Sequence, residues 1–127
     1  VRLIDFGTAK ISANGIDPPT SREECGSKPY MAPEILMAED APKPYTSACD
    51  FFSFGVMLYE FAEKRYPFGT NPAYEDVEKE YVQPNLLDEE GVEVPHLYDL
   101  LAGLLDWDPH SRLGGDSKEN GIERLKH

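Results

Sequence analysis

Basic residues, cysteines and long apolar runs are all scarce in this 127-residue sequence. Its 12 Lys and Arg residues are outnumbered by 24 Asp and Glu residues, which gives a formal net charge of -12. A nucleic-acid interface needs clustered basic side chains, so this balance argues against nucleic-acid binding and favours a basic over an acidic partner. The two cysteines, Cys25 and Cys49, are too few for a disulfide framework. We therefore expect a reducing compartment, the cytoplasm or the nucleus.

No apolar run approaches the roughly 20 residues that a membrane-spanning helix needs. The longest, around residues 54–59, is far shorter, and the first seven residues lack the basic flank and apolar core of a signal peptide. We therefore expect no membrane span. With 40% hydrophobic and 28% charged residues, the chain has the composition of one globular domain with a modest core.

The pattern of apolar residues predicts a mainly α-helical body with a short strand at its start. Val1 to Ile4 favour a strand that ends in a turn at residues 5–7. Residues 12–33 contain several prolines and no periodic pattern, which predicts a long loop. Loops of that length are uncommon in compact domains and are usually functional, so this segment is the first place to look for activity.

A helix is predicted over residues 47–64, with Ser47 as its N-cap and Asp50 completing a capping box. Its apolar residues surround it almost completely, which is typical of a buried helix. The leucines after Pro95 recur at helical spacing and predict an amphipathic second helix. Two further helices are predicted over residues 72–81 and 121–126.

Five short motifs follow one another along the chain. They are Asp5-Phe6-Gly7, Cys25-Gly26-Ser27, Ala32-Pro33-Glu34, Asp50-Phe-Phe-Ser-Phe-Gly55 and Asp108-Pro-His-Ser-Arg112. In this order they resemble the C-terminal lobe of a eukaryotic protein kinase, over essentially the whole chain. The sequence Arg112-Leu-Gly-Gly115, followed by Gly121-Ile-Glu-Arg-Leu-Lys-His127, is similar to the AGC group of serine/threonine kinases.

The resemblance implies an α+β protein-kinase-like fold, of which this chain is one partial domain, truncated at both ends. Residues 1–34 correspond to the activation segment, with one or two short strands at its start, and residues 35–127 to the helical lobe. The sequence contains no glycine-rich loop, no strand lysine and no catalytic loop with its base Asp and metal-binding Asn. We therefore expect no catalytic base among these residues and a base Asp upstream.

The activity that the resemblance implies is transfer of the γ-phosphoryl group of ATP, with Mg²⁺, to Ser or Thr hydroxyls of protein substrates. The alternative is a pseudokinase, in which the same lobe acts as a scaffold for protein interactions. Retention of Asp5 and Gly7 argues against the scaffold. An upstream His-Arg-Asp sequence would indicate an enzyme, and a substituted Asp would indicate a scaffold.

The Asp-Phe-Gly motif is the expected cofactor-binding turn. Mg²⁺ prefers hard oxygen ligands and takes one or two carboxylates together with substrate phosphates, so Asp5 is the expected metal ligand. A plain turn or N-cap aspartate is the alternative. Phe6 is expected to pack as an apolar plug that sets active or inactive geometry. Gly7 is expected to act as a hinge, because glycine visits positive φ freely.

The resemblance assigns substrate binding to Gly26, Ser27 and Glu60. Ser27 stands where the family has a threonine whose hydroxyl touches the catalytic Asp, and a serine keeps that hydroxyl. Glu60 matches the position where kinases that prefer basic substrates hold an arginine of the target. The alternative is that Glu60 is a solvated residue near a helix end. Lys28-Pro29 departs from the group's usual Pro-Glu, so preference just after the target residue is not carried over.

Four further residues have expected structural roles. Glu34 and Arg112 resemble the family's buried ion pair, which an arginine can form with two parallel hydrogen bonds. Asp50 resembles the carboxylate that accepts hydrogen bonds from the catalytic-loop backbone, and this role and helix capping are compatible. Phe52 stands where the family has a tryptophan, so the apolar anchor is kept and the indole N–H is lost.

The activation loop has an acid where activated AGC relatives have a phosphorylated threonine. Glu23 occupies that position, and its charge of -1 replaces only part of the roughly -1.5 to -2 of a phosphate. We expect Glu23 to support basal activity without phosphorylation there, and Thr20 and Ser21 are candidate phosphosites. The alternative is that Glu23 is simply a solvated loop charge.

Residues 75–106 contain ten acidic residues and one lysine. Such a surface is suited to steering a basic substrate toward the protein. A solvated surface without a binding role is the alternative.

The isolated 127-residue chain is expected to have no kinase activity, because the base and the nucleotide-covering loop are not in its sequence. Incubation of the purified chain with labelled ATP and Ser/Thr peptides tests this. Any transfer of label to a peptide would contradict the assignment of the chain to a partial kinase domain.

Overall fold

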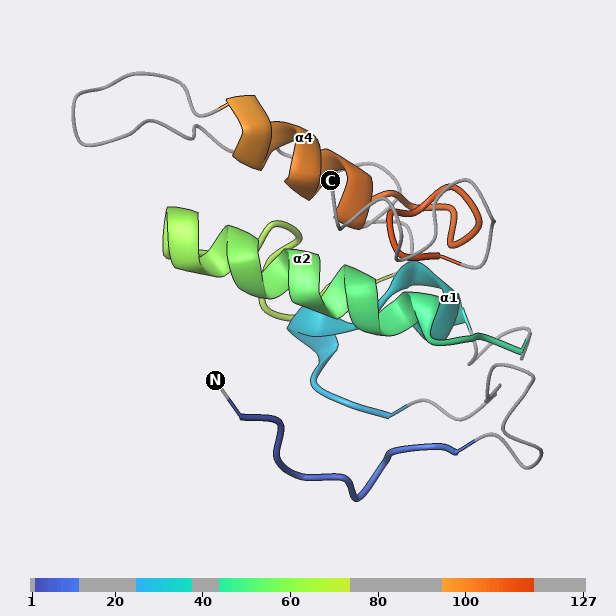
Figure 1. The fold of residues 1–127 in the computed structure, drawn as a ribbon. Helices are drawn as coiled ribbons and strands as arrows, with labels where there is room; N and C mark the ends of the chain where they lie inside the picture. Colours follow the sequence, from blue (N-terminus) through green and yellow to red (C-terminus); the bar gives the residue numbers. More distant parts are fainter. Residues whose placement is uncertain (1, 12–24, 38–43, 74–94, 116–127) are drawn as a thin grey trace.

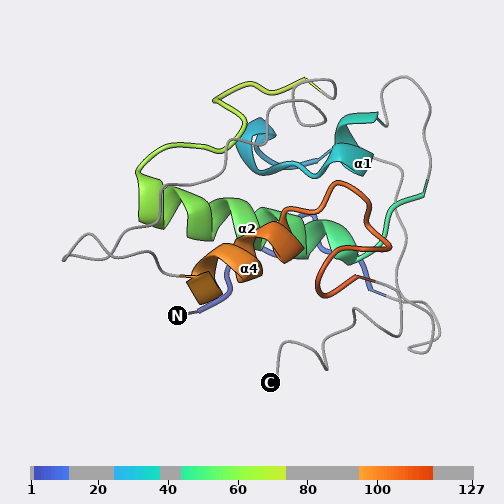
Figure 2. The same cartoon turned by 90° about the horizontal axis from the view of Figure 1, so that it is seen from above.

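The computed structural model describes residues 2–11, 25–37, 44–73 and 95–115. Its elements are a 3₁₀ turn η1 (Lys28–Tyr30) and the helices α1 (Pro33–Leu36), α2 (Ala48–Glu63) and α4 (Pro95–Leu104). Helix α2 runs through the middle, with α4 on one side of it and η1 and α1 on another (Figure 1). The view from above shows α4 lying alongside α2 (Figure 2). The described part is mainly helical, as the sequence predicts.

Helix α2 is confirmed, but its predicted capping box is wrong. Ser47 has helical backbone angles, φ -60° and ψ -10°, and makes no side-chain capping bond. A capping serine needs an extended backbone to direct its hydroxyl at the first helical N–H groups. The N–H of Ala48 instead donates to Oγ1 of Thr46 at 3.3 Å. At the other end, Lys64 adopts a left-handed conformation, φ 58°, and its N–H donates to the carbonyl of Glu60.

The core forms where α2 packs against α4 and against residues 31–35. Phe52, Val56, Tyr59 and Leu101 are fully buried there. Close approach of the two helices requires a glycine in α2, because a Cβ at Gly55 would meet the Cβ of Leu104 at 2.9 Å. Side chains of α4 therefore pack directly against the backbone of α2 at Gly55, in addition to the burial of apolar side chains.

The expectation that α2 is buried on every side is wrong for the described part of the chain. Phe54 is 44% exposed and Phe61 62% exposed. The described elements that cover α2 lie on only part of its circumference, whereas its apolar residues surround it. Periodicity predicts which side chains are apolar, but burial also requires an element that packs on that face.

The strand expected at the start of the chain is not present among residues 2–11, which have no regular structure apart from a turn at residues 7–8. Leu3 is 84% and Ile4 82% exposed. A strand is stabilised by hydrogen bonds to a neighbouring strand, and no described segment pairs with these residues. The only bridged position in the described residues is Tyr45, immediately before α2.

Part of the predicted loop is helical. Residues 12–24 lie outside the described part, but residues 28–36 contain η1 and α1, each with a proline in its first turn. Pro29 and Pro33 are therefore helix-initiating residues, because proline already has a helical φ and needs no amide donor at that position.

Helix α4 begins at Pro95 as predicted. The helices predicted over 72–81 and 121–126 fall outside the described residues, except for residues 72 and 73, which are not helical. None of the helices in the ranges that the structure describes is sufficiently long and apolar to cross a membrane.

Candidate functional site

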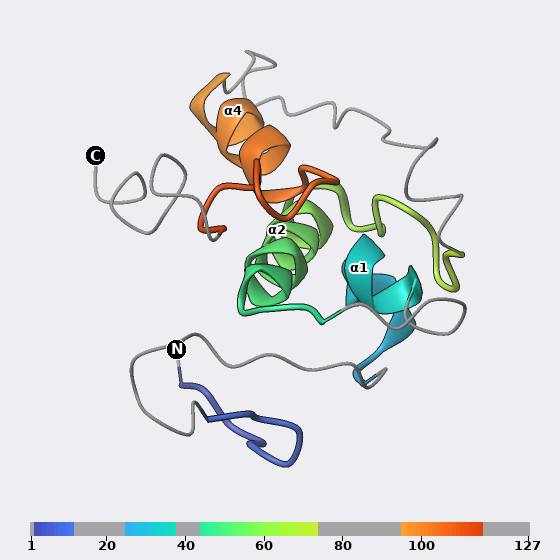
Figure 3. The same ribbon diagram turned by 90° about the vertical axis from the view of Figure 1, so that its right-hand side faces the viewer.

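A cavity of about 430 Å³ lies where three stretches of the chain meet. They are the N-terminal segment, the residues leading into η1, and the first turns of α2. Figure 3 shows the N-terminal segment and residues 25–30 on the same side of α2. The cavity is lined by five of the residues that the sequence singles out, which are Asp5, Phe6, Gly26, Ser27 and Asp50.

Asp5 lines this cavity, and the backbone turns sharply there. Asp5 has φ 61°, a left-handed conformation that aspartate tolerates better than most residues. Its Oδ1 accepts the N–H of Gly7 at 3.4 Å, and the N–H of Ala9 donates to the carbonyl of Phe6 at 3.1 Å. Asp5, and not Gly7, has the positive φ in this turn, and the hinge role expected of Gly7 stays a prediction. A Cβ at Gly7 would lie 3.3 Å from Oδ1 of Asp5, so glycine leaves room for the carboxylate.

The donor set around Asp5 fits a Mg²⁺ ion that takes few protein ligands. No group of three or more acidic, histidine or cysteine side chains suited to a metal occurs in the part of the chain that the structure describes. Mg²⁺ typically uses one or two carboxylates and completes its shell with water and substrate phosphates. Asp5 is exposed and lines the cavity, which fits that mode.

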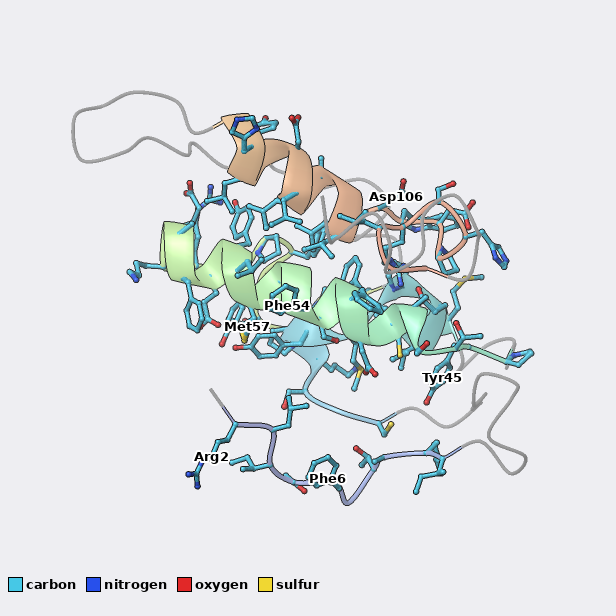
Figure 4. The ribbon with its side chains drawn as sticks, in the orientation of Figure 1. Arg2, Phe6, Tyr45, Phe54, Met57 and Asp106 are labelled. Carbon is cyan, nitrogen blue, oxygen red and sulfur yellow. The ribbon has the colours of Figure 1, made fainter. Side chains whose placement is uncertain are left out.

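Phe6 does not pack as the predicted apolar plug. It lines the cavity but is 69% exposed. In Figure 4 its ring stands on the N-terminal segment, apart from α2. All of residues 2–11 are exposed, so this segment contributes no side chain to the core of the described lobe.

The cavity is also lined by Gly26 and Ser27. Gly26 has φ 115°, a conformation that a residue with a side chain rarely adopts. This turn leaves Ser27 exposed, with its hydroxyl making no capping bond to η1. The carbonyl of Ser27 accepts the N–H of Tyr30 at 2.9 Å, which ties the backbone at Ser27 to η1.

Arg112 and Glu34 join the last described segment to α1. The two guanidinium nitrogens NH1 and NH2 donate to Oε1 and Oε2 of Glu34 at 2.6 and 2.9 Å. Nε donates to the carbonyl of Asp106, NH1 also to that of Ala48 and NH2 also to that of Trp107. All five N–H donors of a fully buried arginine are thereby used. The guanidinium also lies 5.1 Å from the ring centroid of Phe52.

Glu60 is a partnered residue and not a freely solvated one. The hydroxyl of Tyr30 donates to its Oε2 at 2.6 Å. This hydrogen bond to the carboxylate raises the pKa of Tyr30 well above its usual value, so the hydroxyl stays protonated and remains a donor. Sequence reasoning did not single out Tyr30, because its role arises from a contact across 30 residues.

Asp50 lies at the start of α2 with an exposed side chain on the cavity wall. It is not part of a capping box, and its Oδ1 accepts a long hydrogen bond from Sγ of Cys49 at 3.9 Å. The carboxylate is thus available to a group entering the cavity. Glu34, Glu60 and Arg112 do not line the cavity, and Thr20, Ser21 and Glu23 lie outside the described residues.

Comparison with known proteins decides the family. The model of the protein kinase domain matches residues 1–121. The chain belongs to the protein kinase family. Similar relatives include the eye isozyme of protein kinase C of Drosophila melanogaster, 35% identical over 90% of this chain, and the serine/threonine-protein kinase YPK2/YKR2 of Saccharomyces cerevisiae, 33% identical over 100%. The human RAC-beta serine/threonine-protein kinase is 35% identical over 94%. These relatives confirm the similarity to AGC-type kinases.

This kinase chain spans only 15% to 24% of the length of those relatives. It therefore corresponds to a portion of a kinase of their length. The motifs that indicate the family supply residues that line the cavity, form the ion pair of Glu34 with Arg112 and begin α2. The site is therefore built from those motifs.

The two cysteines of the kinase chain differ in accessibility. Both line the cavity, but Cys25 is half-buried and Cys49, in α2, is buried. Burial raises the pKa of the Cys49 thiol to about 12. Because the thiolate is the reactive form, Cys49 is protected by both its burial and its protonation.

We therefore expect a thiol reagent at pH 8 to label Cys25 in the folded protein and both cysteines of this segment only after denaturation. Peptide mapping of the labelled full-length protein measures this. The folded-state thiol of Cys49 resists ionisation up to about pH 12, while an unfolded one ionises near 9.0. The neutral Cys49 thiol therefore contributes fully to the free energy of unfolding below pH 9.0, and this contribution is lost as the pH rises toward 12. Equal labelling of both residues in the folded state would contradict the burial of Cys49.

Proposed function

We propose that this chain is part of a serine/threonine protein kinase that transfers the γ-phosphoryl group of ATP to hydroxyls of protein substrates, with Mg²⁺. One observation supports it most strongly. Asp5 and the exposed Ser27, which come from different stretches of the chain, line the same cavity. A kinase site needs a metal-binding carboxylate next to the surface that holds the substrate hydroxyl.

In this proposal each cavity residue has its own role. Asp5 holds the metal ion, which when bound neutralises charge on the phosphates. Gly26 keeps the backbone turned so that Ser27 faces the substrate residue. Asp50 orients the backbone of the catalytic loop through hydrogen bonds. Catalysis then rests on positioning and on charge compensation, and the general base comes from a part of the protein outside these residues.

Substrate preference and regulation belong to the same proposal. Glu60 holds a basic side chain of the substrate, in keeping with the net charge of -12. Glu23 supports basal activity in place of a phosphate, with Thr20 and Ser21 as candidate phosphosites. We propose the cytoplasm or the nucleus as the location, which two free thiols favour.

The experiment is an assay of the purified full-length protein with γ-labelled ATP and pools of Ser, Thr and Tyr peptides, with and without Mg²⁺. We expect label on Ser and Thr peptides only, and none without metal. Absence of transfer from a folded protein, together with a substituted base Asp upstream, would indicate a pseudokinase scaffold instead.

Phosphatase treatment before that assay tests the role of Glu23. Activity is expected to survive the treatment and to fall in the Glu23→Ala variant. If activity is lost on phosphatase treatment and Glu23→Ala has no effect, activation depends on phosphorylation of a nearby hydroxyl and not on Glu23.

A further inference from the structure

Tyr30 is attached to α2 at two points, two helical turns apart. Its carbonyl accepts the hydroxyl of Ser53 at 2.8 Å, and its own hydroxyl donates to Glu60 at 2.6 Å. Ser53 and Glu60 are seven residues apart, so they lie on one face of the helix, about 10 Å apart along its axis. The side chain of Tyr30 therefore runs along α2 from Ser53 to Glu60.

A third contact fixes the ring of Tyr30 from the side. The ring of Tyr66 meets it edge-on, with the centroids 5.5 Å apart and the planes at 82°. The two hydroxyl oxygens lie 3.5 Å apart. Tyr66 follows the end of α2, so it reaches Tyr30 from outside the helix. Edge-to-face packing of this kind restricts a ring beyond the effect of its buried area.

The consequence for Glu60 is a carboxylate with one oxygen occupied and one available. Tyr30 engages Oε2, and no hydrogen bond or ion pair to Oε1 occurs among the residues that the structure describes. A carboxylate fixed by a neutral donor keeps its negative charge while losing rotational freedom. Such a preorganised group binds a cationic side chain more tightly than a mobile one does.

We propose that Ser53 and Tyr66 are positioning residues for the Glu60 carboxylate, acting through Tyr30, and that they set the affinity of the kinase for a basic side chain in its substrate. This inference rests on the proposed function and extends it to two residues that contact Tyr30, of which Ser53 also lines the cavity. Ser53 fixes the backbone of Tyr30, and Tyr66 fixes its ring. Loss of either contact frees Tyr30, and Glu60 then loses its fixed orientation.

The test uses the full-length kinase and serine peptides that contain one arginine at each upstream position in turn, with an all-alanine reference peptide. For the best arginine peptide, Ser53→Ala and Tyr66→Leu are each expected to raise KM about fivefold, the effect of one neutral hydrogen bond, with kcat unchanged. KM for the alanine peptide should stay within about twofold of wild type, because that peptide has no cation for Glu60.

Conservative variants and a matched control separate positioning from general damage. Ser53→Thr keeps the hydroxyl and should retain the low KM. Tyr66→Phe keeps the edge-on ring and should lie between wild type and Tyr66→Leu. Tyr98→Leu removes another half-buried tyrosine, on α4, and should leave the ratio of the two KM values unchanged. Equal KM increases for arginine and alanine peptides, or no increase for either, would overturn the inference.

The same peptides distinguish failure of the inference from failure of the proposed function. If the wild-type protein phosphorylates none of them, the proposed function fails, and fluorescence anisotropy then measures binding of the arginine and alanine peptides directly. Weaker binding of the arginine peptide alone, in Ser53→Ala and Tyr66→Leu, supports the positioning role. Unchanged arginine preference in these variants rejects it.

Discussion

Replacement of Arg112 by methionine is expected to lower the free energy of unfolding by about 3–5 kcal/mol, the cost of breaking a buried ion pair on one side. The substitution leaves the carboxylate of Glu34, whose side chain is 13% exposed, without its cation. It also removes the donors that the carbonyls of Ala48, Asp106 and Trp107 use. In a thermal melt of the full-length protein, the kinase-domain transition should fall by roughly 10 °C.

The chain offers a matched control for this prediction. Arg65 pairs with Glu63 at 3.3 Å, but the side chain of Arg65 is 48% exposed. Solvent screens such a pair, so Arg65→Met should change stability by no more than about 1 kcal/mol. Arg112→Lys should destabilise nearly as much as Arg112→Met, because an ammonium group cannot supply five N–H donors. Equal melting temperatures for Arg112→Met and Arg65→Met would show that the buried ion pair does not stabilise the fold more than the exposed pair does.

Replacement of Asp5 by asparagine is expected to reduce phosphoryl transfer by about a thousandfold, since a metal ion contributes several kcal/mol of charge stabilisation in such reactions. The fold should be unaffected. Asp5 is exposed and has φ 61°, a conformation that asparagine also tolerates. The amide oxygen can still accept the N–H of Gly7 and loses only the negative charge. Steady-state assays with saturating ATP, together with a thermal melt, measure both effects.

Asp99→Asn is the control for that loss. Asp99 is an exposed aspartate on α4 and does not line the cavity, so its variant should retain wild-type turnover. A lower melting temperature for Asp5→Asn would assign a structural role to Asp5. Wild-type turnover with an unchanged melt would show that Asp5 is not the metal ligand.

Local sequence patterns predict the two longer helices of the described part, because helical periodicity acts over a few residues. They do not predict η1, which lies in a segment expected to be a loop. The spacing of leucines after Pro95 predicts α4, and the dense apolar run predicts α2. The strand expected at residues 1–4 is not confirmed by the described residues 2–4, because a strand depends on a partner that local sequence does not specify. The capping box at Ser47 was wrong because it depends on backbone angles that only the preceding turn determines.

In the site, too, features set by local sequence are predictable and features set by contacts between distant residues are not. The motifs predict Asp5, Ser27, Asp50 and the pair of Glu34 with Arg112, since each motif preserves a residue type that its chemistry requires. Sequence could not predict which of these residues line the cavity, or that Asp5 and not Gly7 has the positive φ. Tyr30 has no motif of its own and becomes visible only through its contacts to residues more than 20 positions away.

Phosphoryl transfer by the purified full-length protein, followed by identification of the labelled amino acid, tests the central claim most directly. The measurement supplies γ-labelled ATP and Mg²⁺ to the wild-type protein and to Asp5→Asn, with one mixed pool of Ser, Thr and Tyr peptides. The account predicts phosphoserine and phosphothreonine from the wild type and about a thousandfold less from Asp5→Asn. Phosphotyrosine as the main product, or equal transfer by the two proteins, would contradict it.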